Sequence, residues 1–189
     1  MIILMGVAGS GKSTQGRLLA DQKGYAWIST GEILRVLITG SRRQEMLKGK
    51  LLSDQEMTNV MDKVLDIIDL KDEFVLDGFP RTIVQARWLL DQVDQHRFSR
   101  IVVLHLFSDR QVVHDRLKQR GRADDSEKAI AERFKEYESV TLPILEELKQ
   151  HGIKIYDIDA SQKPEAIHRK IMQYLANLPV NWPPNGNSA

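Results

Sequence analysis

Cysteine is missing from this chain of 189 residues. Its absence excludes disulfide bonds, thiol nucleophiles and thiolate zinc sites, so we expect no zinc. Long apolar runs are also missing: none approaches the roughly 20 residues that a membrane-spanning helix needs, and the opening MIILM is too short for a signal-peptide core. We therefore expect a cytoplasmic protein without a membrane partner.

An excess of charge of either sign is absent too, because 27 lysines and arginines face 26 acidic residues. This balance gives no general attraction to nucleic acid, so we expect none as a partner and expect any anion binding to be local. The length suits one main domain, and we expect a monomer. Only residues 178–189, LPVNWPPNGNSA, have the composition of a flexible tail.

Short β-rich runs alternate with longer segments of helical period along the rest of the chain. The runs are Met1 to Met5, Tyr25 to Ile28, Phe74 to Leu76, Ile101 to Phe107 and Ile153 to Ile158. Strands that alternate with helices predict an α/β fold with a parallel sheet of about five strands, covered by helices on both faces.

Two serine motifs predict helix starts. SDQE, residues 53–56, has the form of a capping box before a run of apolar residues at helical spacing, and SDRQ, which begins at Ser108, has the same form. In the last predicted helix one stripe indicates the core face: Ile167, Ile171, Tyr174, Leu175 and Leu178.

Residues 6–14, GVAGSGKST, match the phosphate-binding pattern G-x-x-x-x-G-K-[S/T] between a strand and a helical run. Glycines let backbone N–H groups point at an anion, Lys12 reaches the outer phosphates, and the Ser13 hydroxyl suits Mg²⁺. We therefore predict that this loop binds ATP with bound Mg²⁺. The ATP-binding residues of the loop are Gly9, Ser10, Gly11, Lys12, Ser13 and Thr14.

A second polar motif, DGFPRT, follows the third predicted strand at residues 77–82. Ligands of parallel sheets collect at the carboxyl ends of the strands, so this motif faces the same crevice as the phosphate-binding loop. Asp77 can order the water shell of Mg²⁺, and Arg81 is presented on a turn that Pro80 stiffens.

A third motif, STGEILR at residues 29–35, presents Arg35 near a helix start. Alone, it is more typical of a capped helix, Ser29 with Glu32, followed by a surface arginine. Together with Arg81, however, Arg35 forms a pair of guanidinium groups suited to a second anion. Transfer between two phosphates needs such a pair, because donor and acceptor repel each other.

More arginines gather about a glycine turn in DRLKQRGRADDSEKAIAERF: Arg116, Arg120, Arg122 and Arg133. For any one of them a solvated helix face is an equally good interpretation. As a group they would serve a transition state whose charge is spread over three oxygens.

The motifs, in this order, resemble the adenylate kinase family of nucleoside monophosphate kinases. The resemblance rests on GVAGSGKST, STGEILR, DGFPRTIVQA, RLKQRGRADD and AERFKEY, which span nearly the whole chain. It implies a P-loop NTPase-type fold with a small monophosphate-binding flap and a very short ATP lid. Only Gly121 separates Arg120 from Arg122 in that lid.

The resemblance also implies residue roles. Arg116 and Arg120 join the loop in binding ATP, and the catalytic residues are Lys12, Arg81, Arg122 and Arg133. The AMP-binding residues are Thr30, Gly31, Arg35, Gly78, Arg81 and Gln85. Thr30 and Gln85 match adenine-contacting positions, and a Gln amide can pair with adenine through one donor and one acceptor.

These residues predict a single kinase domain over residues 1–177, with a monophosphate-binding insertion at 29–60 and a lid at 119–126. We expect a Mg²⁺-dependent adenylate kinase that converts ATP and AMP into two ADP by direct transfer. The alternatives are a CMP/UMP or other monophosphate kinase, a P-loop kinase of a small hydroxy acid, and a nucleotide-binding regulatory module without turnover.

Overall fold

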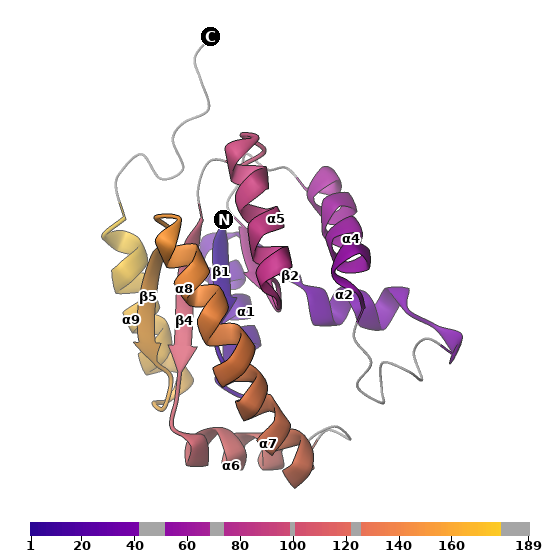
Figure 1. Ribbon diagram of the computed structural model, residues 1–189. Coiled ribbons are helices and arrows are strands. Elements are labelled where there is room, and N and C mark those ends of the chain that lie inside the picture. Colours follow the sequence, from indigo (N-terminus) through magenta and orange to yellow (C-terminus); the bar gives the residue numbers. More distant parts are fainter. Residues whose placement is uncertain (42–51, 69–73, 99–100, 122–125, 179–189) are drawn as a thin grey trace.

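Five parallel strands form one sheet in the computed structural model, which describes residues 1–41, 52–68, 74–98, 101–121 and 126–178 (Figure 1). The strands are β1 (Ile2–Met5), β2 (Ala26–Ser29), β3 (Phe74–Asp77), β4 (Val102–Phe107) and β5 (Lys154–Asp159). Their order is β2-β3-β1-β4-β5, and every neighbouring pair is parallel. The predicted α/β class, the strand number and the parallel arrangement are confirmed.

Side chains of β1 alternate between two apolar layers. Ile3 and Met5 belong to one buried cluster, and Ile2 and Leu4 belong to the other. A strand that is covered on both faces has no solvated side, so all four residues are apolar. This explains why the first strand reads as a continuous apolar run.

Helices cover both faces of the sheet, as predicted (Figure 1). On the Ile3 face, the core includes side chains from α4 (Asp54–Ile67), α5 (Ile83–Asp94) and α8 (Leu142–Gln150). On the Ile2 face it includes side chains from α1 (Lys12–Lys23) and α9 (Pro164–Ala176). The predicted stripe of the last helix packs into this second core.

The remaining described helices follow strands β2 and β4 or connect to α8. Helix α2 (Thr30–Leu37) follows β2, and α6 (Arg110–Arg120) follows β4. Helix α7 (Glu127–Glu136) continues through a π-helical turn, η1 (Tyr137–Thr141), into α8. A third apolar cluster joins α6 and α7 to Val7 of the phosphate-binding loop, which packs the helices on both sides of the predicted lid against that loop.

One of the two predicted serine caps is confirmed. At Ser53 both bonds of the capping box with Glu56 are present. At Ser108 the prediction of a cap is wrong, because α6 begins one residue later, with Asp109 at the cap position and no side-chain cap bond. Ser108 Oγ instead lies 3.2 Å from Ser161 Oγ, so the loop that follows β5 engages the hydroxyl. Among the described residues, no helix is long and apolar enough to cross a membrane.

Candidate active site

In the loop between β1 and α1, two positions come so close to neighbouring elements that only glycine fits there. Gly6 has φ +138°, and a Cβ there would lie 2.1 Å from the carbonyl oxygen of Leu106. Gly9 has φ +87°, and a Cβ there would lie 2.9 Å from the Leu117 side chain of α6. The loop is therefore pressed against β4 and α6, and its shape depends on the absence of side chains.

Helix α1 begins at this loop without a side-chain cap. Gly11 occupies the cap position with φ 98°, and no acidic residue lies in the first turn. The backbone N–H groups at such a helix start remain available to an anion, and the helix dipole favours negative charge there. The arrangement suits a phosphate group, as the sequence motif predicts.

Lys12 is held by its own loop. Its Nζ donates hydrogen bonds to the carbonyl oxygens of Gly6 and Val7, both at 2.8 Å. Burial lowers the pKa of this ammonium to about 8, the Asp77 carboxylate opposes that shift, and Arg81, Arg120 and Arg133 add to it. Three arginines from separate parts of the chain therefore act electrostatically on the lysine of the phosphate-binding loop.

Ser13, in the first turn of α1, meets Asp77, the last residue of β3. Leu4 of β1 lies in register with Asp77 of β3, and Ser13 Oγ donates a hydrogen bond to Asp77 Oδ2 at 2.6 Å. A hydroxyl and a carboxylate are the hard oxygen ligands that Mg²⁺ prefers, and the ion commonly keeps several of its waters. The pair therefore fits the predicted magnesium site, in which Asp77 acts through water.

The DGFPRT turn packs closely against the start of α2. Thr30 is buried, and its Oγ1 donates a hydrogen bond to the carbonyl oxygen of Asp77 at 3.3 Å. A Cβ on Gly78 would lie 2.5 Å from this hydroxyl oxygen. Arg81 is exposed, and its Nε donates to the carbonyl oxygen of Gly78 at 2.9 Å. The peptide bond between Phe79 and Pro80 is cis.

Gln85 is buried with both ends of its amide engaged. Its Oε1 accepts a hydrogen bond from the backbone N–H of Arg81 at 2.8 Å, and its Nε2 donates to Asp54 Oδ1 at 2.9 Å. The Thr82 hydroxyl donates to the same Asp54 oxygen at 2.8 Å. Sequence analysis missed Asp54, because the residue lies inside the SDQE capping box and is 28 residues from Thr82.

Arg35 lies on α2 and pairs with Glu32 of the same helix. The distance from Nη2 to Oε1 is 2.6 Å, and each side chain is 48% exposed. Gly31 lies below the guanidinium, since a Cβ there would be 3.5 Å from Arg35 Nη1. Ser29 caps the helix by accepting a bond from the Glu32 backbone N–H at 3.5 Å, so the capped helix that carries a surface arginine is present, as one interpretation of the STGEILR motif predicted. The binding of a second anion by Arg35 stays a prediction.

Arg116 of α6 binds the loop between β5 and α9. Its guanidinium donates to the carbonyl oxygens of Ala160 at 2.7 Å, Ser161 at 3.4 Å and Gln162 at 2.9 Å. Arg120 ends α6, Arg133 lies on α7, and both act on Lys12. Arg122 lies outside the described residues. Among those that are described, no three His, Asp or Glu side chains gather in a way that would hold a metal ion.

An apolar pocket of about 270 Å³ lies between β2, α2 and the end of α4. Its lining residues are Trp27, Ile28, Ser29, Glu32, Ile33, Val64, Ile67 and Ile68. None of these residues is a predicted ligand of ATP, AMP or Mg²⁺. The predicted site is instead the group of charged residues around Lys12.

The described residues bring two kinds of predicted anion-binding group into the surroundings of Lys12. The phosphate-binding loop offers backbone N–H groups and an ammonium, while the DGFPRT turn offers a guanidinium beside a carboxylate that can hold a metal ion. Opposite charges arranged in this way can bring two phosphate groups together and neutralise their repulsion.

Comparison with known proteins confirms the predicted family. The family model described as adenylate kinase matches residues 4–153. The chain is 36% identical over 172 residues to adenylate kinase 1 of Synechocystis sp., covering 88% of this chain and 91% of that protein. It is 36% identical over 181 residues to the adenylate kinase of Rhodopirellula baltica, with 92% and 94% covered, and 33% identical over 180 residues to that of Mycobacterium sp., with 92% and 98% covered. The chain belongs to the adenylate kinase family.

Proposed function

We propose that the chain transfers the γ-phosphoryl group of ATP to AMP and so forms two ADP. The loop around Lys12 binds ATP, and Arg35 and Arg81 bind the phosphate of AMP. The observation that carries the proposal is the geometry of the phosphate-binding loop, in which the carbonyl oxygens of Gly6 and Val7 hold the ammonium of Lys12 and the Ser13 hydroxyl bonds to Asp77. Burial lowers the pKa of Lys12, Asp77 raises it, and Arg81, Arg120 and Arg133 lower it further, so these three arginines add positive charge to the surroundings of the loop. A site with this excess of positive charge is suited to two phosphorylated ligands at once.

In this proposal the side chains of the protein bind the two nucleotides, orient their phosphate groups and neutralise the phosphate charge. A phosphate oxygen of AMP is already an anionic nucleophile, so no side chain has to remove a proton from it. Lys12 and the N–H groups of the loop hold the donor phosphates in line, and Arg81 holds the acceptor phosphate against its natural repulsion. Arg122 and Arg133 neutralise the charge on the transferring group, while Arg116 and Arg120 lie along the bound ATP.

Ser13 and Asp77 would hold the magnesium ion that accompanies ATP. Their oxygens lie 2.6 Å apart at the end of the sheet. The ion would draw charge from the phosphate oxygens during transfer. The Asp77 carboxylate also favours the protonated form of Lys12, because it raises the pKa that burial lowers.

Gln85, with Thr30, reads the base of AMP, and the Gly31 and Gly78 positions let the acceptor approach the backbone. The predicted flap, 29–60, and lid, 119–126, would exclude water, which would otherwise accept the phosphoryl group; their residues 42–51 and 122–125 lie outside the described residues. The protein acts as a cytoplasmic monomer on nucleotides.

The test is phosphoryl transfer from Mg²⁺-ATP to AMP, CMP, UMP, GMP and their deoxy forms in parallel, with formation of ATP and AMP from ADP as the reverse reaction. We expect AMP to be preferred and the reverse reaction to proceed. Preference for a pyrimidine monophosphate would reassign the base pocket and leave the kinase activity. Tight ATP binding without transfer to any monophosphate would instead favour a regulatory module.

A further inference from the structure

Asp54 reaches the predicted acceptor site from a different element. It is the first residue of α4 and is half-buried, and its Oδ1 accepts hydrogen bonds from Thr82 at 2.8 Å and from Gln85 at 2.9 Å. These bonds attach the start of α4 to the start of α5 beside the DGFPRT turn. Among the described residues, the two hydrogen bonds of the Asp54 side chain go to Thr82 and Gln85, neither of which is a predicted phosphate ligand, so we expect its effect on the reaction to pass through these partners.

The contacts on either side of Gln85 allow only one orientation of its amide. On one side, Oε1 accepts from the backbone N–H of Arg81, and on the other, Nε2 donates to the Asp54 carboxylate. A backbone N–H can only donate, and an ionised carboxylate can only accept. The reversed amide would therefore set N–H against N–H and oxygen against carboxylate, and Gln85 is too deeply buried for water to relieve both conflicts.

We propose that Asp54 is a specificity-determining positioning residue, which fixes the polarity of the Gln85 amide and thereby selects adenine over purines with an oxygen at position 6. This inference rests on the proposed function, in which Gln85 reads the acceptor base.

The selectivity for adenine follows from the hydrogen-bonding groups of the Gln85 amide that its two internal bonds leave unused. After its two internal bonds, Gln85 keeps one acceptor lone pair on Oε1 and one N–H on Nε2. Adenine presents an amino donor at position 6, whereas guanine and hypoxanthine present an oxygen there. A fixed Oε1 accepts from the amino group and repels the oxygen. An amide free to exchange the positions of its oxygen and its NH₂ group could form hydrogen bonds with both kinds of base.

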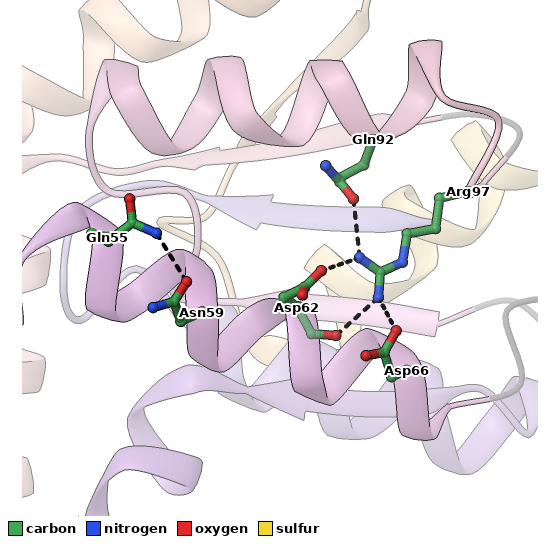
Figure 2. Close-up of polar contacts among 6 residues, drawn as sticks. All are labelled: Gln55, Asn59, Asp62, Asp66, Gln92 and Arg97. Atoms are coloured by element: carbon green, nitrogen blue, oxygen red, sulfur yellow. Dashed lines mark hydrogen bonds and ion pairs between the residues drawn. The ribbon is translucent and has the colours of Figure 1, made fainter.

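The other end of α4 provides a control that leaves Gln85 untouched. Arg97 follows α5 and clamps the last turns of α4: it pairs with the carboxylates of Asp62 and Asp66 and donates to the carbonyl oxygen of Asp62 at 2.9 Å (Figure 2). Gln92 Oε1 accepts from the same guanidinium at 3.0 Å. The substitution Asp62→Asn therefore makes the same chemical change on the same helix, away from the base reader.

The experiment compares Asp54→Asn, Asp62→Asn and the unmodified protein. The acceptors are AMP and inosine monophosphate, whose hypoxanthine base differs from adenine only at ring positions 1 and 6. An asparagine can present either an oxygen or an NH₂ group, so in this variant only the backbone N–H of Arg81 still favours one orientation of the Gln85 amide. We expect the ratio of kcat/KM for AMP over inosine monophosphate to narrow by about tenfold in Asp54→Asn, mainly through faster use of inosine monophosphate. Asp62→Asn should keep the original ratio.

Equal loss with both acceptors in Asp54→Asn would overturn the proposal, because a merely structural brace affects both alike. Equal narrowing in Asp62→Asn would overturn it too, because general loosening of α4 would then explain the effect. If Asp54→Asn does not fold, Asp54→Ser carries the test, because a hydroxyl can likewise donate or accept: an unchanged ratio in that variant overturns the proposal, and a narrowed ratio supports it. Failure of the proposed function is separate, since it is absence of transfer to AMP in the unmodified protein.

Discussion

On the donor side of the site, Lys12 is held by carbonyl groups five and six residues away, whereas on the acceptor side α2, α4 and the DGFPRT turn meet through side chains that are far apart in sequence. The donor loop is buried against α6 and β4, while Arg35 and Arg81 remain exposed or half-exposed and bind their own neighbours. The shape of the predicted donor loop thus depends on contacts within one short stretch, whereas the shape of the predicted acceptor side depends on contacts between separate elements. We therefore expect selectivity to be tuned on the acceptor side.

Lys12→Met tests the donor side and should have the largest effect. The variant loses the ammonium that neutralises the donor phosphates, so we expect transfer to fall about a thousandfold for every acceptor. Initial rates with each monophosphate at saturating ATP measure this. A loss confined to one monophosphate would contradict the placement of Lys12 on the donor side.

Arg81→Ala tests the acceptor side. Removing this guanidinium leaves the acceptor phosphate poorly neutralised, so we expect kcat/KM for AMP to fall about a hundredfold or more. The affinity for ATP, measured by calorimetry, should change little. Arg87→Ala is the matched control, because Arg87 is a surface residue that pairs with Glu147 at 2.7 Å, and it should behave like the unmodified protein. If the affinity of Arg81→Ala for ATP falls as much as its kcat/KM for AMP, Arg81 does not belong to the acceptor side alone.

Glu32→Gln sharpens the comparison further. In the structure Glu32 occupies the Arg35 guanidinium, so the acceptor phosphate has to compete with a carboxylate for it. Both side chains are 48% exposed, which keeps the pair weak, and we expect the KM for AMP to fall only about two- to fivefold. The KM for ATP serves as the internal reference. A rise in the KM for AMP would mean that Glu32 orients Arg35 and does not compete for it.

The smallest effect concerns the helices on both sides of the predicted lid. The imidazole of His114 on α6 contacts Glu127 of α7 at 2.8 Å. Hydrogen bonds first with Glu127 and then with Asp115 raise its pKa above the ordinary value. A raised pKa means that the contact stabilises the fold fully below the ordinary histidine pKa, and that this contribution disappears as the pH rises through the folded-state pKa.

We therefore expect His114→Gln to lower Tm slightly in mildly acidic buffer and not in alkaline buffer. Thermal unfolding of both proteins across this range measures the difference. If the Tm of His114→Gln is lower by the same amount at every pH, the contact stabilises the fold through packing and not through the charge of the imidazole.

Much of the fold was predictable because it depends on local patterns. The five strands and the covered sheet follow from alternating short apolar runs and helical segments, and the structure confirms them. The family prediction from the ordered motifs is confirmed by the comparisons. The cap at Ser108 failed, since a serine near a helix start can equally bond to another loop, and only the position of Ser161 decided between them.

The predicted residue roles also depend on contacts between distant segments of the chain. The roles of Arg35, Arg81, Arg116, Arg120 and Gln85 remain predictions, and Arg122 lies outside the described residues. For Arg116 the structure adds three carbonyl partners in the loop after β5, which lies more than forty residues further along the chain. For Gln85 it adds Asp54. No pattern in the sequence brings these partners together, because their contacts arise only when separate helices pack.

The sequence by itself determined the phosphate-binding loop, the parallel sheet and the family, because glycine spacing, apolar periodicity and motif order are properties of short stretches of chain. Only the tertiary structure decided which charges act on Lys12, how Asp54 engages the Gln85 amide and how Arg97 clamps α4 (Figure 2). The physical reason is that pKa shifts and hydrogen-bond polarity depend on distances between atoms, and packing sets those distances.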